Sequence, residues 1–196
     1  MRLIHRLTFW LLTIGLALLL AGCQRERLHQ QESYVFGTRV EVITWGAPEP
    51  EARAATAAVL QEFDRLHRAY HAWEPSELTA LNTAIAAGTT QIPVSPELAT
   101  LLADAKAIAA TGDELFNPAL GQLIALWGFH TDTFTPTRPA PDALAAAIKA
   151  RPSMADLTIN GSTVSSRNRA VQIDLGGYAK GYALDRAATL LRQRGI

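Results

Sequence analysis

The 196-residue sequence contains one cysteine, so no disulfide can form within the chain. Its 18 Lys and Arg side chains equal its 18 Asp and Glu side chains, which argues against the broad positive surface of a nucleic-acid-binding protein. The GxxxxGK(S/T) loop of P-loop proteins, the HExxH helix of zinc proteases and the GxSxG turn of serine hydrolases are all absent. We therefore expect no nucleic-acid partner, and any bound anion must be held by a few local groups.

Two weaker candidates for binding chemistry are a histidine pair and scattered aromatic residues. His67 and His71 are four residues apart, a spacing that lets both face one metal ion from a helix. Without an HExxH motif or a nearby cysteine, two histidines on a helix surface are the more common explanation. Trp73, Trp127 and Phe129 could stack on a flat ring, although aromatic residues beside helices more often belong to the core.

The N-terminal segment 1–22 is typical of a signal peptide. Two arginines precede an apolar run that is too short for a stable membrane span. The run ends in LAGC, which resembles the bacterial lipobox, where the cysteine is lipidated. This resemblance predicts a lipid anchor at Cys23 on the periplasmic side of a bacterial envelope, and Gln24 slightly favours the outer membrane over the inner one. The alternative is an ordinary signal peptide with an incidental cysteine.

The remainder of the chain predicts a folded domain over residues 34–196 after a polar tether at 23–33. Hydrophobic residues make up 48% of the sequence and charged residues 18%, enough for a real core. Alternating apolar residues predict a strand over 34–46, interrupted at Gly37 by a bulge or a close backbone approach. Helical spacing and cap residues predict three helices, one after Pro48 and Pro50 with Val59, Phe63, Leu66 and Tyr70 on one face, one between Ser76 and Gly88, and one between Ser95 and Gly112.

The second half of the sequence mixes helices with short β-segments. It predicts a turn at Asn117-Pro118, helices over 120–127 and 142–150, a hairpin at Asn160-Gly161 and a strand over 170–175. A last helix carries Leu184, Ala188 and Leu191 on one face and ends at Gly195. This order predicts an α+β fold in which helices pack on a mixed sheet. Because a strand–helix unit normally continues into a neighbouring strand, the fold is expected to be truncated, with its C-terminal part missing.

The segment VQIDLGGYAKGYALD, residues 171–185, combines several features of an anion site. Asp174 ends the predicted strand, where open α/β sheets place ligands, and two glycines then allow a tight turn. Lys180 falls in the first turn of the last helix, where the helix dipole disfavours a cation unless an anion is close. Free amides there suit a phosphate, which Asp174 would repel without a donor or a metal ion. The pattern fits a nucleotide diphosphate with a bound cation, although a plain turn with a solvated lysine is the more common meaning of such glycines.

Four motifs occur in an order that resembles the ApbE family, the FAD:protein FMN transferases. They are FGT after the first strand, SELTALN opening a helix, FNPALGQLIALWGF, and IDLGGYAKGYALD, and the resemblance covers residues 36–196. It implies an ApbE-like, T-fold-like domain that binds FAD and Mg²⁺. It also implies an enzyme that attaches FMN to a threonine or serine of a target protein, a subunit of a membrane redox complex.

The resemblance further implies which residues form the site. The FAD-contacting positions are Phe36, Ala72, Leu115, Phe116, Asn117, Asp174 and Lys180, and Gly177 offers its backbone carbonyl to magnesium. Phe36 stands where the family usually has methionine, and Asn117 and Ala119 replace the usual aspartate and threonine. On this interpretation Lys180 meets FAD with the metal ion beside it. No residue of this chain is assigned a catalytic role.

Two other functions stay open. A magnesium-dependent FAD pyrophosphatase would use water in place of the protein hydroxyl at nearly the same site. A non-catalytic lipoprotein would only bind flavin or scaffold other envelope proteins. Because the family's acidic magnesium-binding segment is not matched, this chain alone is expected to be inactive.

Overall fold

The computed structural model describes residues 28–131, 133 and 135–196. The predicted signal peptide (1–22), the lipidation site Cys23 and the start of the predicted tether lie outside the described residues. The described part of the chain has the α+β fold that the sequence predicts, with helices and two small antiparallel sheets. No helix within it is long and apolar enough to cross a bilayer.

The described chain begins with a β-hairpin. β1 (His29–Val35) pairs antiparallel with β2 (Thr38–Thr44). Phe36 and Gly37 form the connecting two-residue turn with φ angles of 54° and 68°, because a hairpin turn of type I′ needs positive φ at both positions.

The hairpin differs from the sequence-based expectation in two ways. It replaces the predicted single strand over 34–46, and residues 29–33 of the predicted tether belong to β1. The sequence of β1 is too polar to predict a strand from apolar alternation. It is polar because part of the contact between β1 and the helix that follows the hairpin is made by polar side chains. In that contact the Thr56 hydroxyl donates to Gln31 Oε1 over 2.9 Å.

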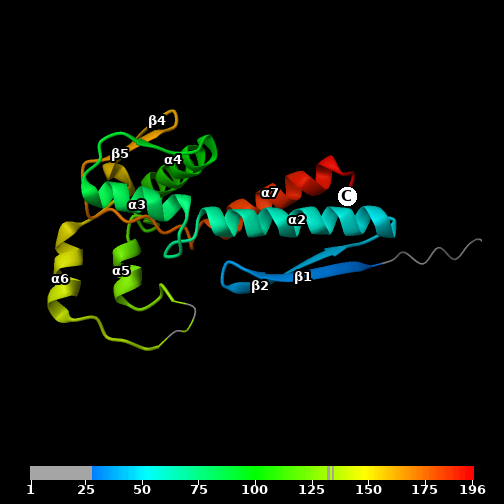
Figure 1. Ribbon diagram of the computed structural model, residues 1–196, viewed down its shortest axis with the longest axis horizontal. Helices are drawn as coiled ribbons and strands as arrows, with labels where there is room; N and C mark the ends of the chain where they lie inside the picture. The colour runs from blue at the N-terminus through cyan, green and yellow to red at the C-terminus, as the bar shows by residue number, and fades with distance from the viewer. Residues whose placement is uncertain (1–27, 132, 134) are drawn as a thin grey trace, which may run out of the picture.

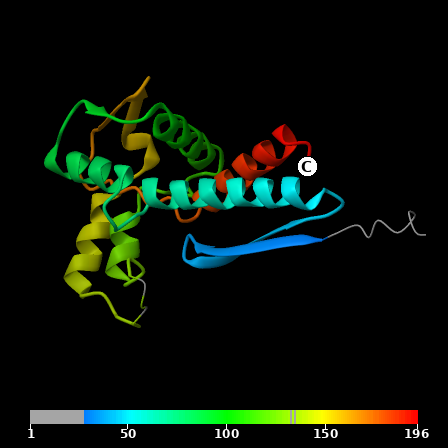
Figure 2. The same ribbon diagram turned by 45° about the vertical axis from the view of Figure 1, so that its right-hand side comes forward.

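The long helix α2 (Glu49–Ala69) contacts both the N-terminal hairpin and the last helix of the described chain. The hairpin lies along one side of α2 and α7 (Ala179–Gln193) along another (Figures 1 and 2). Val59, Phe63 and Leu66 of α2 are buried, as their helical spacing predicts. The turn that precedes α7 is therefore held close to the end of α2.

The helix α7 joins the core through small side chains. Ala179, Ala183 and Ala187 are buried, whereas Leu184 is 63% exposed. The apolar face that the sequence indicates through Leu184 is therefore not the buried face, which lies one position earlier in the chain. Alanines let two helix backbones approach closely, a packing choice that a count of apolar side chains does not reveal. Gly195 follows the helix with a φ of 74°, in agreement with its predicted role as the stop.

A charged network fastens α7 to α2 and α4. Arg65 donates to Glu62 and, over 2.8 Å through both terminal nitrogens, to Glu97. Arg186 donates to Glu62, and the Tyr182 hydroxyl donates to Glu97. The hydrogen bond from Arg65 is the main reason that the pKa values of Glu62 and Glu97 are lowered.

The helices α3 (Glu77–Ala87) and α4 (Pro96–Thr111) have the predicted caps. The Ser76 hydroxyl accepts from the Thr79 N–H, and the Ser95 hydroxyl accepts from the Leu98 N–H. Gly88 ends α3 with a φ of 82°, the left-handed conformation that favours glycine. These ends are set by contacts within a few residues.

The remaining elements include the predicted helices and hairpin in the predicted order, together with β3 and η1, which the sequence did not predict. They are β3 (Ile92–Pro93), α5 (Gly121–Leu126), α6 (Pro141–Ala150), the 3₁₀ helix η1 (Met154–Asp156), β4 (Leu157–Asn160) and β5 (Thr163–Ser166). β4 and β5 form the predicted hairpin, and β3 pairs with β5, which gives a three-stranded antiparallel sheet in the order β3-β5-β4. This sheet and α3 to α6 form the half of the molecule away from the N-terminal hairpin (Figure 1).

The predicted strand over 170–175 is extended but forms no regular ladder. Its one β-bridge is parallel, between Gln172 and Leu120. Gly121 donates to the Gln172 carbonyl over 2.8 Å, and a side chain at Gly121 would place a Cβ only 2.7 Å from that oxygen. One edge of the segment is therefore paired with residues 118–121.

The other edge of the segment is occupied by the side chain of Asn82. Its amide nitrogen donates to the Ile173 carbonyl over 2.9 Å, and its amide oxygen accepts from the Ile173 N–H over 2.7 Å. Asn82 is buried and thus replaces a strand partner with one side chain. This substitution explains why a segment with the alternating burial of a strand lacks a strand's ladder.

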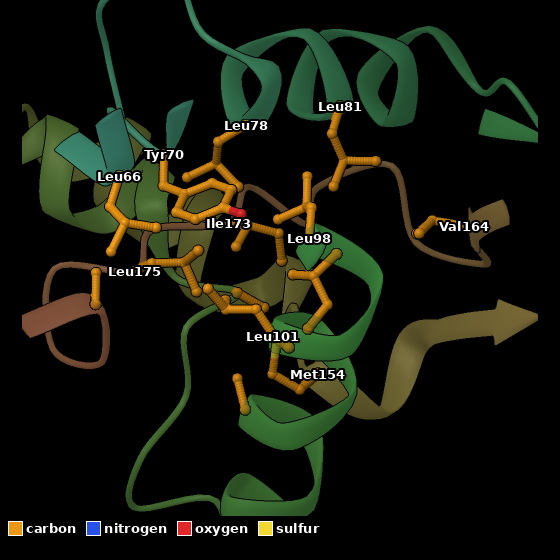
Figure 3. Close-up of a cluster of buried hydrophobic side chains, with 14 of the residues drawn as sticks. Leu66, Tyr70, Leu78, Leu81, Leu98, Leu101, Met154, Val164, Ile173 and Leu175 are labelled. Atoms are coloured by element: carbon orange, nitrogen blue, oxygen red, sulfur yellow. The ribbon is translucent and has the colours of Figure 1, made fainter. Parts of the chain in front are cut away.

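The core surrounds this segment. Figure 3 shows Leu66 and Tyr70 of the α2 end, Leu78 of α3 and Leu98 of α4 gathered about Ile173. Leu175 is also buried, so the segment enters its following turn directly from the core. The position of that turn is thereby tied to α2, α3 and α4.

We expect Asn82→Leu to lower the free energy of unfolding by about 2–4 kcal/mol, because both backbone groups of Ile173 then stay buried without partners. Urea unfolding followed by circular dichroism measures the change. Thr83→Val is the matched control, since its exposed hydroxyl donates only to the Thr79 carbonyl of the same helix. Equal losses in the two variants would contradict the role given to Asn82.

Candidate functional site

The candidate site is the turn between Ile173 and α7. Asp174 Oδ1 accepts a hydrogen bond from the Gly176 N–H over 2.8 Å, which closes a local turn. Gly177 is exposed, and a Cβ there would lie 3.7 Å from the ring of Phe116. Gly177 thus brings the backbone of the turn close to the ring of Phe116, and a Cβ at Gly176 would lie 3.0 Å from Asp174 Oδ1.

The second oxygen of Asp174 meets a histidine that the sequence analysis did not single out. His130 Nε2 lies 2.7 Å from Asp174 Oδ2, and the two side chains are only 9% and 8% exposed. Burial raises the pKa of Asp174, but the hydrogen bonds from His130 and Gly176 and the charges of His130 and Lys180 outweigh it, so the pKa is lowered. The carboxylate is therefore ionised and accepts at both oxygens.

An aromatic row leads away from this pair. The Trp73 ring is stacked on His130 at 5.2 Å and 24°, and it meets His71 edge-on at 4.4 Å. His71 contacts His67, whose ring in turn meets Phe36 at 5.7 Å. The row connects the hairpin turn to Asp174 and passes the loop that contains Ala72.

A second group of aromatic rings lies near Gly177 and the start of α7. Phe116 is near Tyr178 at 6.3 Å, and Tyr178 is stacked near Tyr182 at 6.4 Å. Leu115, beside Phe116, is 94% exposed. An exposed leucine next to half-buried rings offers an apolar surface to a flat ligand.

The loop that carries Leu115 and Phe116 is strained and anchored. Asp113 and Glu114 have φ angles of 51° and 61°, which costs energy for residues other than glycine. The Ser153 hydroxyl donates to Glu114, and the Asn117 amide donates to the Pro152 carbonyl while its oxygen accepts from the Ala119 N–H. The side chain of Asn117 is thus engaged in holding the loop.

Lys180 lies in the first turn of α7 and is exposed. No side chain caps the N-terminus of α7. A cation and a helix N-terminus therefore occur together beside the ionised Asp174, and both attract an anion.

The structure brings most of the predicted site residues together. Asp174, Gly177, Lys180 and Phe116 lie at the turn, and Leu115 adjoins them in sequence. Ala72 is linked to the turn through its neighbour Trp73 and His130, whereas Phe36 is at the far end of the aromatic row. His130 was missed because it is 44 residues from Asp174 in sequence and no motif spacing connects the two.

The described residues do not form a complete metal site. Nowhere in the described ranges do three or more His, Cys, Asp or Glu side chains gather in a way that could hold a metal ion. The predicted histidine pair, His67 and His71, is in ring contact but gains no third ligand. Gly177 can supply one carbonyl oxygen, which is a suitable ligand for Mg²⁺ but not a site by itself.

Comparison with known proteins gives a consistent result. The model of the ApbE family matches residues 36–196. The chain is 49% identical over 164 residues to a FAD:protein FMN transferase of Rhodobacter capsulatus, covering 83% of this chain and 31% of that relative. It is 30% identical to a FAD:protein FMN transferase of Klebsiella pneumoniae, covering 93% of this chain and 55% of that relative. The chain thus spans about a third to a half of these relatives.

Solved structures share the fold. The crystal structure of the ApbE protein of Thermotoga maritima superposes with a TM-score of 0.75 at 27% identity, covering 86% of this chain and 53% of that one. The flavin transferase ApbE of Vibrio cholerae superposes with a TM-score of 0.74 at 22% identity, covering 87% and 55%. The predicted ApbE-like α+β fold is confirmed.

The lowered pKa of Asp174 predicts a pH-dependent contribution to stability. A carboxyl group whose folded pKa lies below its ordinary value of 3.8 stabilises the fold above that value. The contribution is lost as the pH falls through the folded pKa. Asp174→Asn should therefore unfold more easily than wild type at pH 7, by about 1–2 kcal/mol, with a difference that shrinks below pH 4.

Urea unfolding at several pH values measures this difference. Asp104→Asn is the control, because Asp104 is exposed on α4 and the substitution should have little effect at any pH. A difference for Asp174→Asn that stays constant down to pH 3 would show that its charge does not stabilise the turn.

Proposed function

Because the chain belongs to the ApbE family, we propose that its protein is a FAD:protein FMN transferase. The reaction joins a threonine or serine oxygen of the target protein to the FMN phosphorus of FAD. The bond between that phosphorus and the AMP oxygen breaks, AMP leaves with the electron pair, and the hydroxyl proton is released. The products are a phosphoester-linked flavoprotein and AMP.

One observation carries the proposal: the exposed Lys180 and the uncapped N-terminus of α7 stand beside a buried, ionised Asp174. The pyrophosphate of FAD is a compact anion and suits this cationic end of the turn. Developing negative charge on the phosphoryl oxygens is stabilised by fixed dipoles and cations that are already in place. Lys180 would therefore bind the substrate and assist departure of the leaving group.

The carboxylate of Asp174 does not forbid an anion nearby. Its two oxygens accept hydrogen bonds from His130 and Gly176, so part of its charge is compensated within the protein. Repulsion toward a diphosphate is thereby reduced. Asp174 can therefore lie near a phosphate, since hydrogen-bond donors accompany its carboxylate.

Two apolar surfaces near the turn suit the two ring systems of FAD. Leu115 and Phe116 adjoin Gly177, and Trp73, which is 39% exposed and follows Ala72, is stacked on His130. Flat heteroaromatic rings bind by stacking and apolar contact with such side chains. The pyrophosphate between the two rings would then lie at the turn.

Magnesium is part of the proposal as a partner of the substrate phosphates. When bound, Mg²⁺ supplies Lewis-acid stabilisation of the pyrophosphate oxygens. The Gly177 carbonyl would be one ligand. The remaining ligands would be phosphate oxygens, water or groups outside the described residues, as is usual for this ion.

We also propose that the protein is lipid-anchored through Cys23 on the periplasmic side of the envelope, with the outer membrane slightly favoured. The support is the LAGC motif at the end of the predicted signal peptide. A subunit of a membrane redox complex would be the flavinylated partner, because an anchored enzyme meets such subunits at the membrane surface.

The full-length protein, FAD, Mg²⁺ and a purified acceptor subunit test the transfer. We expect covalent flavin fluorescence on the acceptor and AMP release, whereas equimolar free FMN and AMP without labelling would indicate a pyrophosphatase. Lys180→Gln should lower the FAD affinity about tenfold, because a cation beside the phosphates is lost. Lys149→Gln, at the exposed C-terminal end of α6, is the matched control and should match wild type.

Membrane fractionation tests the anchor. Cys23→Ser should move the protein from the membrane fraction to the soluble periplasmic fraction, since the thiol that carries the lipid is lost. Metabolic labelling with a palmitate analogue should fail in the same variant. Continued labelling of Cys23→Ser would place the lipid elsewhere or refute the lipobox.

A further inference from the structure

We propose that His130 is a positioning residue that holds the Asp174 carboxylate in a fixed orientation for FAD, and that Trp73 fixes the plane of the His130 ring. The inference rests on the proposed function for the identity of the ligand. The pair itself is a property of the described chain.

The direction of the hydrogen bond follows from charge. An ionised carboxylate can only accept, and the pKa of Asp174 is lowered, so His130 must donate through Nε2. Asp174 Oδ1 is already bonded to the Gly176 N–H. With a donor on each oxygen, the carboxylate cannot rotate without losing one of them.

The hydrogen bond between His130 and Asp174 is important because both side chains are buried. Both side chains are more than nine-tenths buried, and an ionised carboxylate in such a place is costly unless it is hydrogen-bonded. Asp174 lies at the end of a segment that Asn82 and residues 118–121 hold on both edges. The backbone is therefore already placed, and His130 determines the side chain.

Trp73 limits what His130 can do. Its ring stacks on the imidazole at 5.2 Å with only 24° between the planes, so the imidazole cannot tilt out of its plane without losing the stack. Trp73 and Ala72 belong to the loop between α2 and α3, whereas His130 follows α5. The contact therefore joins two loops to the turn.

The alternative is that His130 serves only the stability of the fold. The two roles differ in what they predict for FAD binding by folded variants. A positioning residue changes the ligand affinity through Asp174. A structural residue changes the unfolding free energy and leaves the affinity of the folded protein unaltered.

The test uses three single variants, His130→Leu, His130→Gln and Asp174→Ala, in the full-length protein. It also uses the double variant that combines His130→Leu with Asp174→Ala. FAD dissociation constants come from flavin fluorescence, and thermal unfolding confirms that each variant is folded. We expect His130→Leu to weaken FAD binding about tenfold and to raise KM for FAD with kcat within about threefold. His130→Gln keeps an N–H donor of similar reach and should restore binding to within about threefold of wild type.

The double variant separates action through Asp174 from independent effects. If His130 acts through Asp174, the double variant should bind FAD no more weakly than Asp174→Ala alone. Additive losses would overturn the inference, as would unchanged affinity in His130→Leu or equal losses in His130→Leu and His130→Gln. Arg167→Leu is the matched control, because it removes a partner of the buried Asp156 carboxylate in a different part of the fold, and FAD affinity should stay unchanged.

Measuring FAD binding and FMN transfer separately distinguishes failure of this inference from failure of the proposed function. Wild-type protein that binds FAD tightly but labels no acceptor would refute the transferase and still decide the role of His130 by affinity. Wild-type protein that binds no FAD would overturn both proposals.

Discussion

The contact between Asn82 and Ile173 is the constraint on which the site depends. One buried amide satisfies the N–H and the C=O of Ile173, so the chain leading to Asp174 is held without a neighbouring strand on that edge. The opposite edge is paired with residues 118–121, which adjoin the loop that carries Phe116. Asn82 on one edge and residues 118–121 on the other thus hold the turn in place, and the turn places the charged groups that follow it.

Charge is divided across the turn in an ordered way. Asp174 is turned inward, where His130 and the Gly176 N–H compensate its charge, while Lys180 is exposed at the start of α7. The inward carboxylate of Asp174 would repel a diphosphate, whereas the outward ammonium group of Lys180 would attract it. Because the anion is screened by its own donors, the net effect on an approaching phosphate is attractive. The same inward contact lowers the pKa of Asp174, so the stability of the fold and the proposed binding of FAD both involve one carboxylate.

The packing of the helices brings the elements around the turn close together. α7 meets α2 through alanines, which brings its N-terminus close to the loop that follows α2. The Arg65 network then fixes α7 against α2 and α4 by polar contacts at the edge of the core. Strain in the loop at Asp113 and Glu114 is tolerated because Ser153 and Pro152 anchor it from another element.

The sequence by itself determined the features that depend on neighbouring residues. The caps at Ser76 and Ser95, the stop at Gly88 and the hairpin at Asn160-Gly161 follow from local backbone chemistry and appear as predicted. The motif order also indicated the family and the glycine-rich turn. Tertiary structure alone decided the pairing of Asp174 with His130, the replacement of a strand partner by Asn82 and the alanine face of α7 that leaves Leu184 exposed. These contacts join residues far apart in sequence, and no local propensity encodes which distant side chain will fill a given space.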